Sequence, residues 1–152
     1  MKSLKIFVCL MLPTSAFAGD LNIKDAFIPV APPGAMAHAA YMEISNPGET
    51  AEQIIGVTAE GYAMAHLHKS EVVNDVATMS MVDLIEIAPG QSVALEQGGL
   101  HIMLMRPSGP VSEGDTVTLT LELSDGSSQS IEASVKPMMM KEMPHAHDDN
   151  ES

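Results

Sequence analysis

The feature that most constrains the fold of this chain is a series of short apolar runs separated by turn residues. Residues 116–123 alternate strictly between polar and apolar side chains, which is typical of a half-buried β-strand. Turn-forming residues stand between the runs, as at Asn46-Pro47-Gly48 and Ser124-Asp125-Gly126. Short strands at this spacing indicate an all-β sandwich or barrel. The predicted strands are residues 21–28, 37–45, 51–57, 62–68, 79–87, 92–95, 100–105, 116–123 and 129–135.

The first 18 residues are predicted to be a secretory signal peptide that is not part of the fold. Lys2 and Lys5 accompany a short apolar stretch at residues 6–12, and Ala16-Phe17-Ala18 has the small-x-small pattern of a cleavage site. The apolar stretch is too short to span a bilayer, which argues against an N-terminal membrane anchor. We therefore expect a periplasmic protein without stable membrane insertion, with one domain over residues 19–136.

The composition after cleavage excludes several kinds of site. The single cysteine, Cys9, lies within the signal peptide, in a context that does not fit a lipoprotein cysteine. The mature chain then has no thiol for a disulfide or for a blue-copper centre, which needs a thiolate ligand. The whole chain has 7 basic and 20 acidic residues and a formal charge of −13. A field of this sign repels nucleic acids and anionic lipid surfaces and attracts cations.

Four residues with soft or borderline ligand atoms indicate a metal site. Ten residues separate His68 from Met79, 21 separate Met79 from His101, and His101-Ile102-Met103 closes the set. Residues two apart in a strand share a face, so His101 and Met103 can bind one ion together. Imidazole combined with thioether suits a soft ion, above all copper(I), whereas zinc prefers thiolate, imidazole and carboxylate ligands.

The remaining histidines and methionines of the predicted domain have plainer interpretations. Methionine fills irregular gaps in cores, so five methionines are expected to be core or rim residues. These five are Met36, Met42, Met64, Met81 and Met105. His38 and His66 have no clear partner in the pattern and are not assigned to the site.

The C-terminal segment, residues 137–152, differs in composition from the domain. Pro137 ends the strand pattern, and a Met- and His-rich tract with an acidic end follows it. Such a tract cannot form a core, so we expect a flexible tail. Short His-rich tracts are typical of metal binding, which makes the tail a candidate second site for copper(I) or copper(II). The alternative is an acidic terminus with incidental histidines. The candidate tail ligands are Met138, Met139, Met140, Met143, His145 and His147.

The spacing of the four candidate ligands resembles the motif of the PCuAC family of periplasmic copper(I) chaperones: His, ten residues, Met, 21 residues, His-x-Met. Residues 39–46 are similar to an early strand of that family and residues 98–105 to its signature hairpin. The resemblance covers most of the mature chain and implies a single-domain, cupredoxin-like Greek-key β-sandwich. It also implies that the copper(I) ligands are His68, Met79, His101 and Met103. Met81 does not fit the motif, because only 19 residues separate it from His101.

The chain departs from the family pattern at three positions. Phe27 stands where the family commonly has tryptophan, and Pro29 stands where a basic residue is frequent. Asp75 occupies a usual glycine position in the predicted loop between His68 and Met79. None of these departures removes a candidate ligand.

The resemblance implies a metallochaperone that is not an enzyme. Members of the family pass copper(I) toward the binuclear copper centre of cytochrome c oxidase, sometimes with a thiol-reducing partner protein. The implied partner is a copper-accepting oxidase subunit or another copper chaperone. The alternatives are a periplasmic copper buffer or resistance protein without a dedicated acceptor, and an adhesion-type sandwich stabilised by its metal. A metalloenzyme is disfavoured because the sequence has no HExxH motif, nucleophile elbow or carboxylate dyad.

Overall fold

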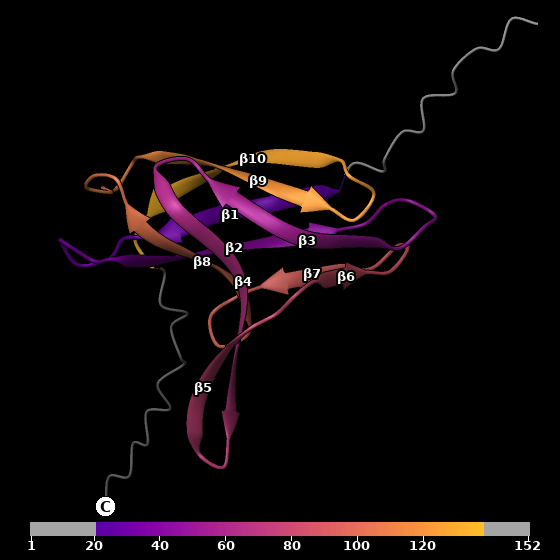
Figure 1. Ribbon diagram of the computed structural model, residues 1–152, viewed down its shortest axis with the longest axis horizontal. Coiled ribbons are helices and arrows are strands. Elements are labelled where there is room, and N and C mark those ends of the chain that lie inside the picture. Colours follow the sequence, from indigo (N-terminus) through magenta and orange to yellow (C-terminus); the bar gives the residue numbers. More distant parts are fainter. Residues whose placement is uncertain (1–20, 139–152) are drawn as a thin grey trace, which may run out of the picture.

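The computed structural model describes residues 21–138, which form ten β-strands (Figure 1). No helix in this range is long and apolar enough to cross a membrane. The predicted signal peptide and all but the first two residues of the predicted tail lie outside the described range. The strands are β1 (Asn22–Pro29), β2 (Ala37–Ser45), β3 (Glu52–Ala59), β4 (Tyr62–Val73), β5 (Val76–Met81), β6 (Ile85–Ile87), β7 (Ser92–Leu95), β8 (Leu100–Pro107), β9 (Thr116–Leu123) and β10 (Ser128–Lys136).

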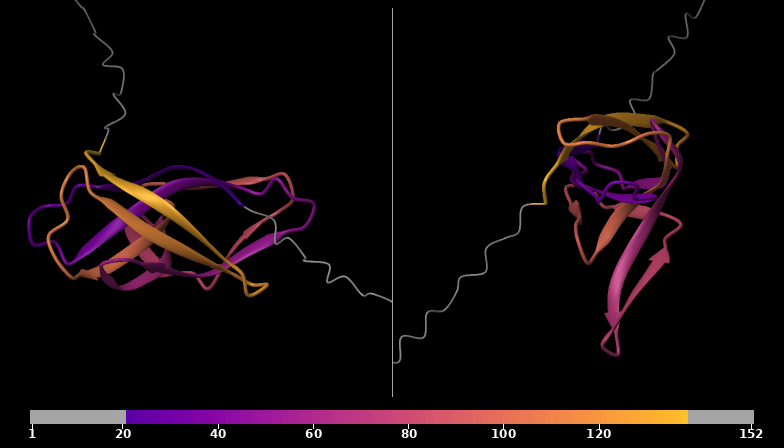
Figure 2. Two further views of the ribbon diagram at one scale, coloured as in Figure 1. Left: turned by 90° about the horizontal axis from the view of Figure 1, so that it is seen from above. Right: turned by 90° about the vertical axis from the view of Figure 1, so that its left-hand side faces the viewer.

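All of these strands join in one hydrogen-bonded sheet with the order β5-β4-β8-β7-β2-β1-β10-β9-β3-β6. Strand β2 divides its edge between two partners, because residues 37–40 pair with β8 and residues 42–45 pair with β7. The sheet curls so that β3 and β4, each next to one end of the order, come together around the turn at Glu60 and Gly61 (Figure 2). Two layers of strands therefore face each other across one core, which confirms the all-β prediction.

Alternating side chains of the strands fill the space between the layers. In β9, Val117, Leu119 and Leu121 are buried, while the threonines between them remain half-buried. Burial of one such aliphatic side chain stabilises a fold by about 1.5–3 kcal/mol. Strands β4 and β8 follow the same rule, so every second residue of these strands lies on the outer face of the sheet. The buried inward residues of β4 and β8 are Leu67, Ile102 and Leu104.

The segment between His68 and Met79 is a β-hairpin, so the prediction of a loop there is wrong. Strand β4 continues to Val73, and β5 begins at Val76. The two residues between them, Asn74 and Asp75, have φ angles of +51° and +62°. Positive φ at both central residues is the requirement of a type I′ hairpin turn. Asn-Asp is a weaker signal for this turn than Asn-Gly, and it was therefore not recognised.

The predicted strand at residues 79–87 is also wrong, because it comprises two strands with different partners. Strand β5 ends at Met81 and pairs with β4. Strand β6 begins at Ile85 and pairs with β3, at the other end of the sheet order. The apolar pattern runs on through Val82 and Leu84, so the change of partner leaves little trace in the sequence.

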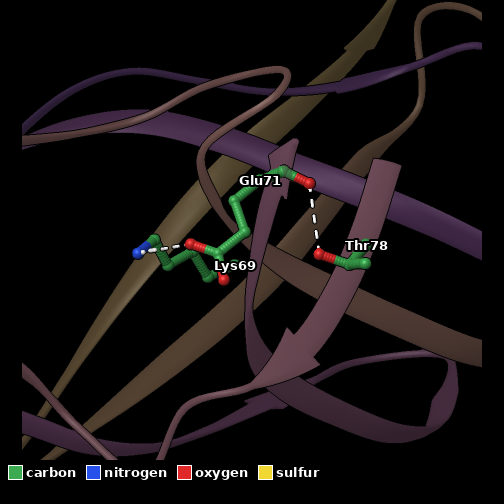
Figure 3. A network of polar contacts seen from close by, with 3 residues as sticks. All are labelled: Lys69, Glu71 and Thr78. Carbon is green, nitrogen blue, oxygen red and sulfur yellow. Dashed lines mark hydrogen bonds and ion pairs between the residues drawn. The ribbon is translucent and has the colours of Figure 1, made fainter. Parts of the chain in front are cut away.

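The β4–β5 hairpin forms an arm that projects from the body of the domain (Figure 1). All six residues of β5 are exposed. Lys69 Nζ lies 3.1 Å from Glu71 Oε2, and Thr78 Oγ1 donates a hydrogen bond of 3.2 Å to the Glu71 carbonyl oxygen (Figure 3). Exposed ion pairs contribute little to stability. The arm therefore depends mainly on its backbone ladder between β4 and β5.

The side chain of Asn46 connects two turns by hydrogen bonds to their backbone groups. Its Nδ2 donates hydrogen bonds to the carbonyl oxygens of Thr50, at 2.7 Å, and Ile87, at 2.9 Å. Its Oδ1 accepts a 2.9 Å hydrogen bond from the Gly48 amide, which closes the turn that the sequence predicts at residues 46–48. Only 1 % of Asn46 is exposed, so water cannot replace these bonds.

We predict that Asn46→Ala destabilises the domain by about 2–4 kcal/mol, because it leaves buried backbone groups without partners. For a domain of this size that corresponds to a fall in Tm of roughly 8–15 °C, measurable by thermal unfolding followed by circular dichroism. Asn22→Ala is the matched control, since Asn22 is exposed at the start of β1. Equal Tm values for the two variants would contradict this role of Asn46.

Candidate metal centre

The candidate metal centre lies on the outer face of the sheet, where β4 and β8 pair. The antiparallel register places His68 directly opposite His101. The centroids of the two imidazole rings are 5.9 Å apart. The neighbours of these histidines in sequence, Leu67 and Ile102, point into the core. Two rings at this separation can place one nitrogen each on a single ion, because directly opposed residues have Cβ atoms only about 4.5–5.5 Å apart.

A backbone contact selects one tautomer of the neutral imidazole of His101. Its Nδ1 lies 3.1 Å from the carbonyl oxygen of Gly99, an atom that can only accept a hydrogen bond. Nδ1 therefore carries the proton, and Nε2 keeps its lone pair. Metal-binding histidines usually donate their second ring nitrogen in this way, which fixes the ring orientation. His101 is 3 % exposed and lies beside the ring of Tyr41, with 6.4 Å between the centroids.

The imidazole of His68 is in the opposite situation. Within residues 21–138, its Nδ1 is the one buried side-chain nitrogen or oxygen that has no hydrogen-bond partner. A buried polar atom without a partner costs free energy, and a metal ion would satisfy its lone pair. Burial lowers the pKa of His68, and the nearby His101 and His66 lower it further. The neutral, ligating form of His68 is therefore favoured.

The structure brings Met103 to the same patch and places the two arm methionines at different positions along the arm. Met103 shares the outer face with His101, yet its direct cross-strand partner is His66. Met79 lies opposite Ser70, two pairs farther along the arm than His68, and is 54 % exposed. The residue directly opposite His68 is Met81, which is 63 % exposed. The residue spacing of the family motif excludes Met81, whereas the pairing of β4 with β5 places Met81 opposite His68.

The other methionines and histidines divide between the two faces. Of the five methionines expected to be core or rim residues, Met42 is buried in the core, Met64 and Met105 are half-buried, and Met36 and Met81 are exposed. His38 faces the interior, where its Nδ1 lies 2.8 Å from the Tyr62 hydroxyl, so it is not part of the centre. His66 lies on the outer face, and its ring centroid is 6.4 Å from that of His68. The two-residue spacing of His66 and His68 in the sequence is the signal that could place both on the same face of the strand.

The donor atoms of this patch suit a soft ion. Within residues 21–138, no group of three or more His, Cys, Asp or Glu side chains is arranged to hold a metal ion. Beside the two imidazoles, this face offers thioether sulfur, from Met103, as a further donor. Such a donor set favours copper(I) over zinc, magnesium or calcium.

A sequence profile of predicted lipoproteins, described as LpqE-like, matches residues 21–135. The chain belongs to the LpqE-like family. A related protein is the predicted lipoprotein Lxx21020 of Leifsonia xyli subsp. xyli, which is 29 % identical over 120 residues, or 78 % of this chain and 71 % of that protein.

Solved structures confirm the resemblance to the PCuAC family and its cupredoxin-like fold. The apo PCuAC domain from PmoF1 superposes with a TM-score of 0.66 at 19 % identity, over 79 % of this chain and 96 % of that domain. The copper-bound PCuAC domain from PmoF2 gives 0.65 at 21 % identity, over 79 % and 95 %. The solution structure of CuI-DR1885 from Deinococcus radiodurans gives 0.61 at 30 % identity, over 75 % and 76 %.

We predict that the His68 imidazole titrates below the ordinary pKa of about 6.5. His101→Gln should raise the pKa of His68. That pKa should remain below 6.5, because burial is the larger cause of its lowering. His66→Gln should raise it by less. The measurement is the pH dependence of the ring signals in two-dimensional ¹H–¹⁵N NMR of the metal-free protein. A titration midpoint of 6.5 for His68 in the wild type and in both variants would contradict the burial of His68.

The same shift fixes the sign of its effect on folding. The unfolded chain takes up the His68 proton at a higher pH than the folded chain, so stability rises with pH through this range. The contribution of neutral His68 to folding stability is fully present above about pH 6.5. It is lost as the pH falls toward the lower pKa that His68 has in the folded state.

Proposed function

We propose that this protein binds copper(I) through His68, Met79, His101 and Met103 and carries it to an acceptor protein. The observation that carries the proposal is the cross-strand pair of His68 and His101, each with a ring nitrogen free for a metal, beside the thioether of Met103. The ion is the cargo of this site.

Copper(I) is the ion favoured by the chemistry of the donors. Thioethers are neutral and polarizable, so they stabilise copper(I) without the strong grip of a thiolate. The net charge of the chain, −13, attracts cations. CuI-DR1885 and the copper-bound PmoF2 domain are named for copper and share this fold, which supports the proposal.

Transport is favoured over catalysis by the position of the site and by its residues. An outer face with an exposed methionine allows the ligands of an acceptor to approach before those of the donor leave. Thioethers cannot act as general acids or bases, and hydrolytic metal catalysis needs such a group beside an open coordination position. The second candidate function is a copper buffer or resistance protein, which would use the same site but lack an acceptor.

We propose an exported protein of the cell envelope, located in the periplasm. The lipoprotein description of the LpqE-like family supports export. The two lysines near the start of residues 1–18, the short apolar stretch and the small-x-small pattern support a signal peptide. The proposed acceptor is an oxidase subunit with a binuclear copper centre or another copper chaperone, with a thiol-reducing protein as a further partner. The acidic surface argues against nucleic acid as a partner.

We predict that Met103→Leu weakens copper(I) binding by at least about tenfold, because it removes one sulfur ligand while nearly preserving side-chain volume. Competition with a chromophoric copper(I) chelator under anaerobic conditions measures the affinity. Met42→Leu is the matched control, because Met42 is buried in the core and its sulfur does not reach the outer face. X-ray absorption should show both sulfur and nitrogen around the copper. A shell of nitrogen and oxygen alone would refute the proposed ligand set.

Transfer to an acceptor distinguishes a chaperone from a buffer. We expect copper(I)-loaded protein to metallate an apo oxidase copper domain faster than the same concentration of copper(I) held by a small chelator of equal affinity. The proteins are mixed in the presence of a reductant, and the reductant is then removed. The visible spectrum of the oxidase copper centre measures how much copper has been transferred. Equal rates for protein and chelator would favour the buffer function.

We further propose that the tail is a separate copper site. Met138 is exposed at the end of the described residues, and Met139, Met140, Met143, His145 and His147 lie outside them. The paired histidines and adjacent acidic residues of the tail suit copper(II), and its methionines suit copper(I).

We predict that truncation after Lys136 abolishes copper(II) binding and leaves the copper(I) site of the domain intact. Lys136 is the last residue of β10, so the truncation leaves all of the described strands intact. Isothermal titration with copper(II), and chelator competition for copper(I), measure the two sites separately. Unchanged copper(II) stoichiometry after truncation would assign that binding to the folded domain.

A further inference from the structure

The row of soft ligands on the outer face does not stop at the proposed copper centre. Along the same two strands, His66 lies opposite Met103, and Met64 lies opposite Met105. Residues two apart in a strand share a face, so Met64, His66 and His68 point to the same side of β4. The β4–β8 ladder therefore continues from the His68–His101 pair through two further pairs of sulfur and nitrogen donors.

Packing in the core does not account for these methionines. The hydrophobic core takes Leu67 from β4 and Ile102 and Leu104 from β8. Met64 and Met105 are absent from the core cluster and from the apolar residues that pack against it, whereas Met42 belongs to it. Both side chains are half-buried on the outer face. Their thioethers are thus available to a ligand at the surface.

We propose that Met64, His66 and Met105 form a second copper(I) subsite beside the first; this inference rests on the proposed copper-carrying function. Two thioethers and one imidazole make a soft, neutral donor set of the kind that copper(I) prefers. Met64 and Met105 are directly opposed, and His66 lies diagonally across from Met105. Diagonal neighbours are about 7–8 Å apart at the backbone, which lies within the combined reach of two long side chains.

Electrostatic repulsion sets the order in which the two subsites fill. The Met64–Met105 pair is two two-residue steps, about 13 Å, from the His68–His101 pair along the strands. Two unit positive charges at this distance weaken the second binding event by roughly twofold at the dielectric constant of water and roughly tenfold at the effective value near a protein surface. The first ion should occupy the centre that contains the preoriented His101, and the second ion should occupy the subsite of Met64, His66 and Met105.

The neighbourhood of the subsites gives the second one a role. The ring of His66 is 6.4 Å from that of His68, and Met103 lies between the two subsites in the register. An ion can therefore pass between the subsites by exchanging one ligand at a time. The outer face of β4 and β8 would then store two ions or move one ion along the sheet.

Titration of the protein with silver(I) tests the subsite, because silver(I) is a soft, air-stable, diamagnetic stand-in for copper(I). The methyl signals of assigned methionines in ¹H–¹³C NMR report each ligand separately. We expect the signals of Met103 to shift with the first equivalent bound to the domain and those of Met64 and Met105 to shift with the next. The methionines of the tail give separate methyl signals, so silver(I) bound to the tail is distinguished from silver(I) bound to the domain.

The double variant Met64→Leu/Met105→Leu should bind one copper(I) fewer than the wild type in chelator competition, while its first affinity stays within about threefold. Met42→Leu is again the control and should retain the full stoichiometry. Thermal unfolding checks that the variants remain folded, and His66→Gln with both methionines intact provides a second test, with an expected loss of at least tenfold in the second affinity only.

Three results would overturn the proposal. The first is an unchanged stoichiometry in the double variant, and the second is the absence of any shift of the Met64 and Met105 methyl groups. The third is a loss of the first affinity in His66→Gln with no later binding step, which would make His66 a ligand of the first centre. Failure of the proposed function has a different signature, because the Met103 methyl signal would then be unaffected by silver(I) at any concentration.

Discussion

The register of β4 against β8 is the constraint on which both the core and the candidate centre depend. Side chains in a strand alternate between faces, so the same alignment that buries Leu67 and Ile102 places His68 opposite His101 on the outer face. A slip of one residue would turn the imidazoles inward and expose the aliphatic residues. The free energy of apolar burial thus holds the geometry of the candidate centre in place.

The two histidines of the centre contribute unequal amounts of preorganisation. His101 is buried, and its ring is fixed by the carbonyl oxygen of Gly99. His68 has a buried nitrogen without a partner and a lowered pKa, so it remains neutral and unsatisfied until a ligand arrives. In the proposed copper centre, the fixed imidazole of His101 would be the rigid ligand, and the unsatisfied nitrogen of His68 would supply part of the driving force for binding. Such a division suits an ion that must be both captured and released.

The sequence predicted the parts of this structure that depend on local periodicity. The alternation in residues 116–123 identified β9, and the spacing of His101 and Met103 identified their common face. The β4–β5 hairpin was missed because Asn74 and Asp75 adopt positive φ without a glycine. The position of Met81 opposite His68 was missed for a different reason: it follows from the pairing of strands, which residue counting does not contain. The outward direction of Met64 and Met105 likewise became evident only when the core was known.

The arm has a mechanical consequence for a metal-loaded protein. Strand β5 joins the body only through β4 and its own continuation into β6, and all of its residues are exposed. An ion shared by Met79 on the arm and His101 on the body would be a cross-link between distant points of the chain. Like any cross-link, it would restrict the freedom of the segment that it closes. Metal loading would then restrict the motion of the arm, and release of the ion would restore that motion to the β4–β5 hairpin.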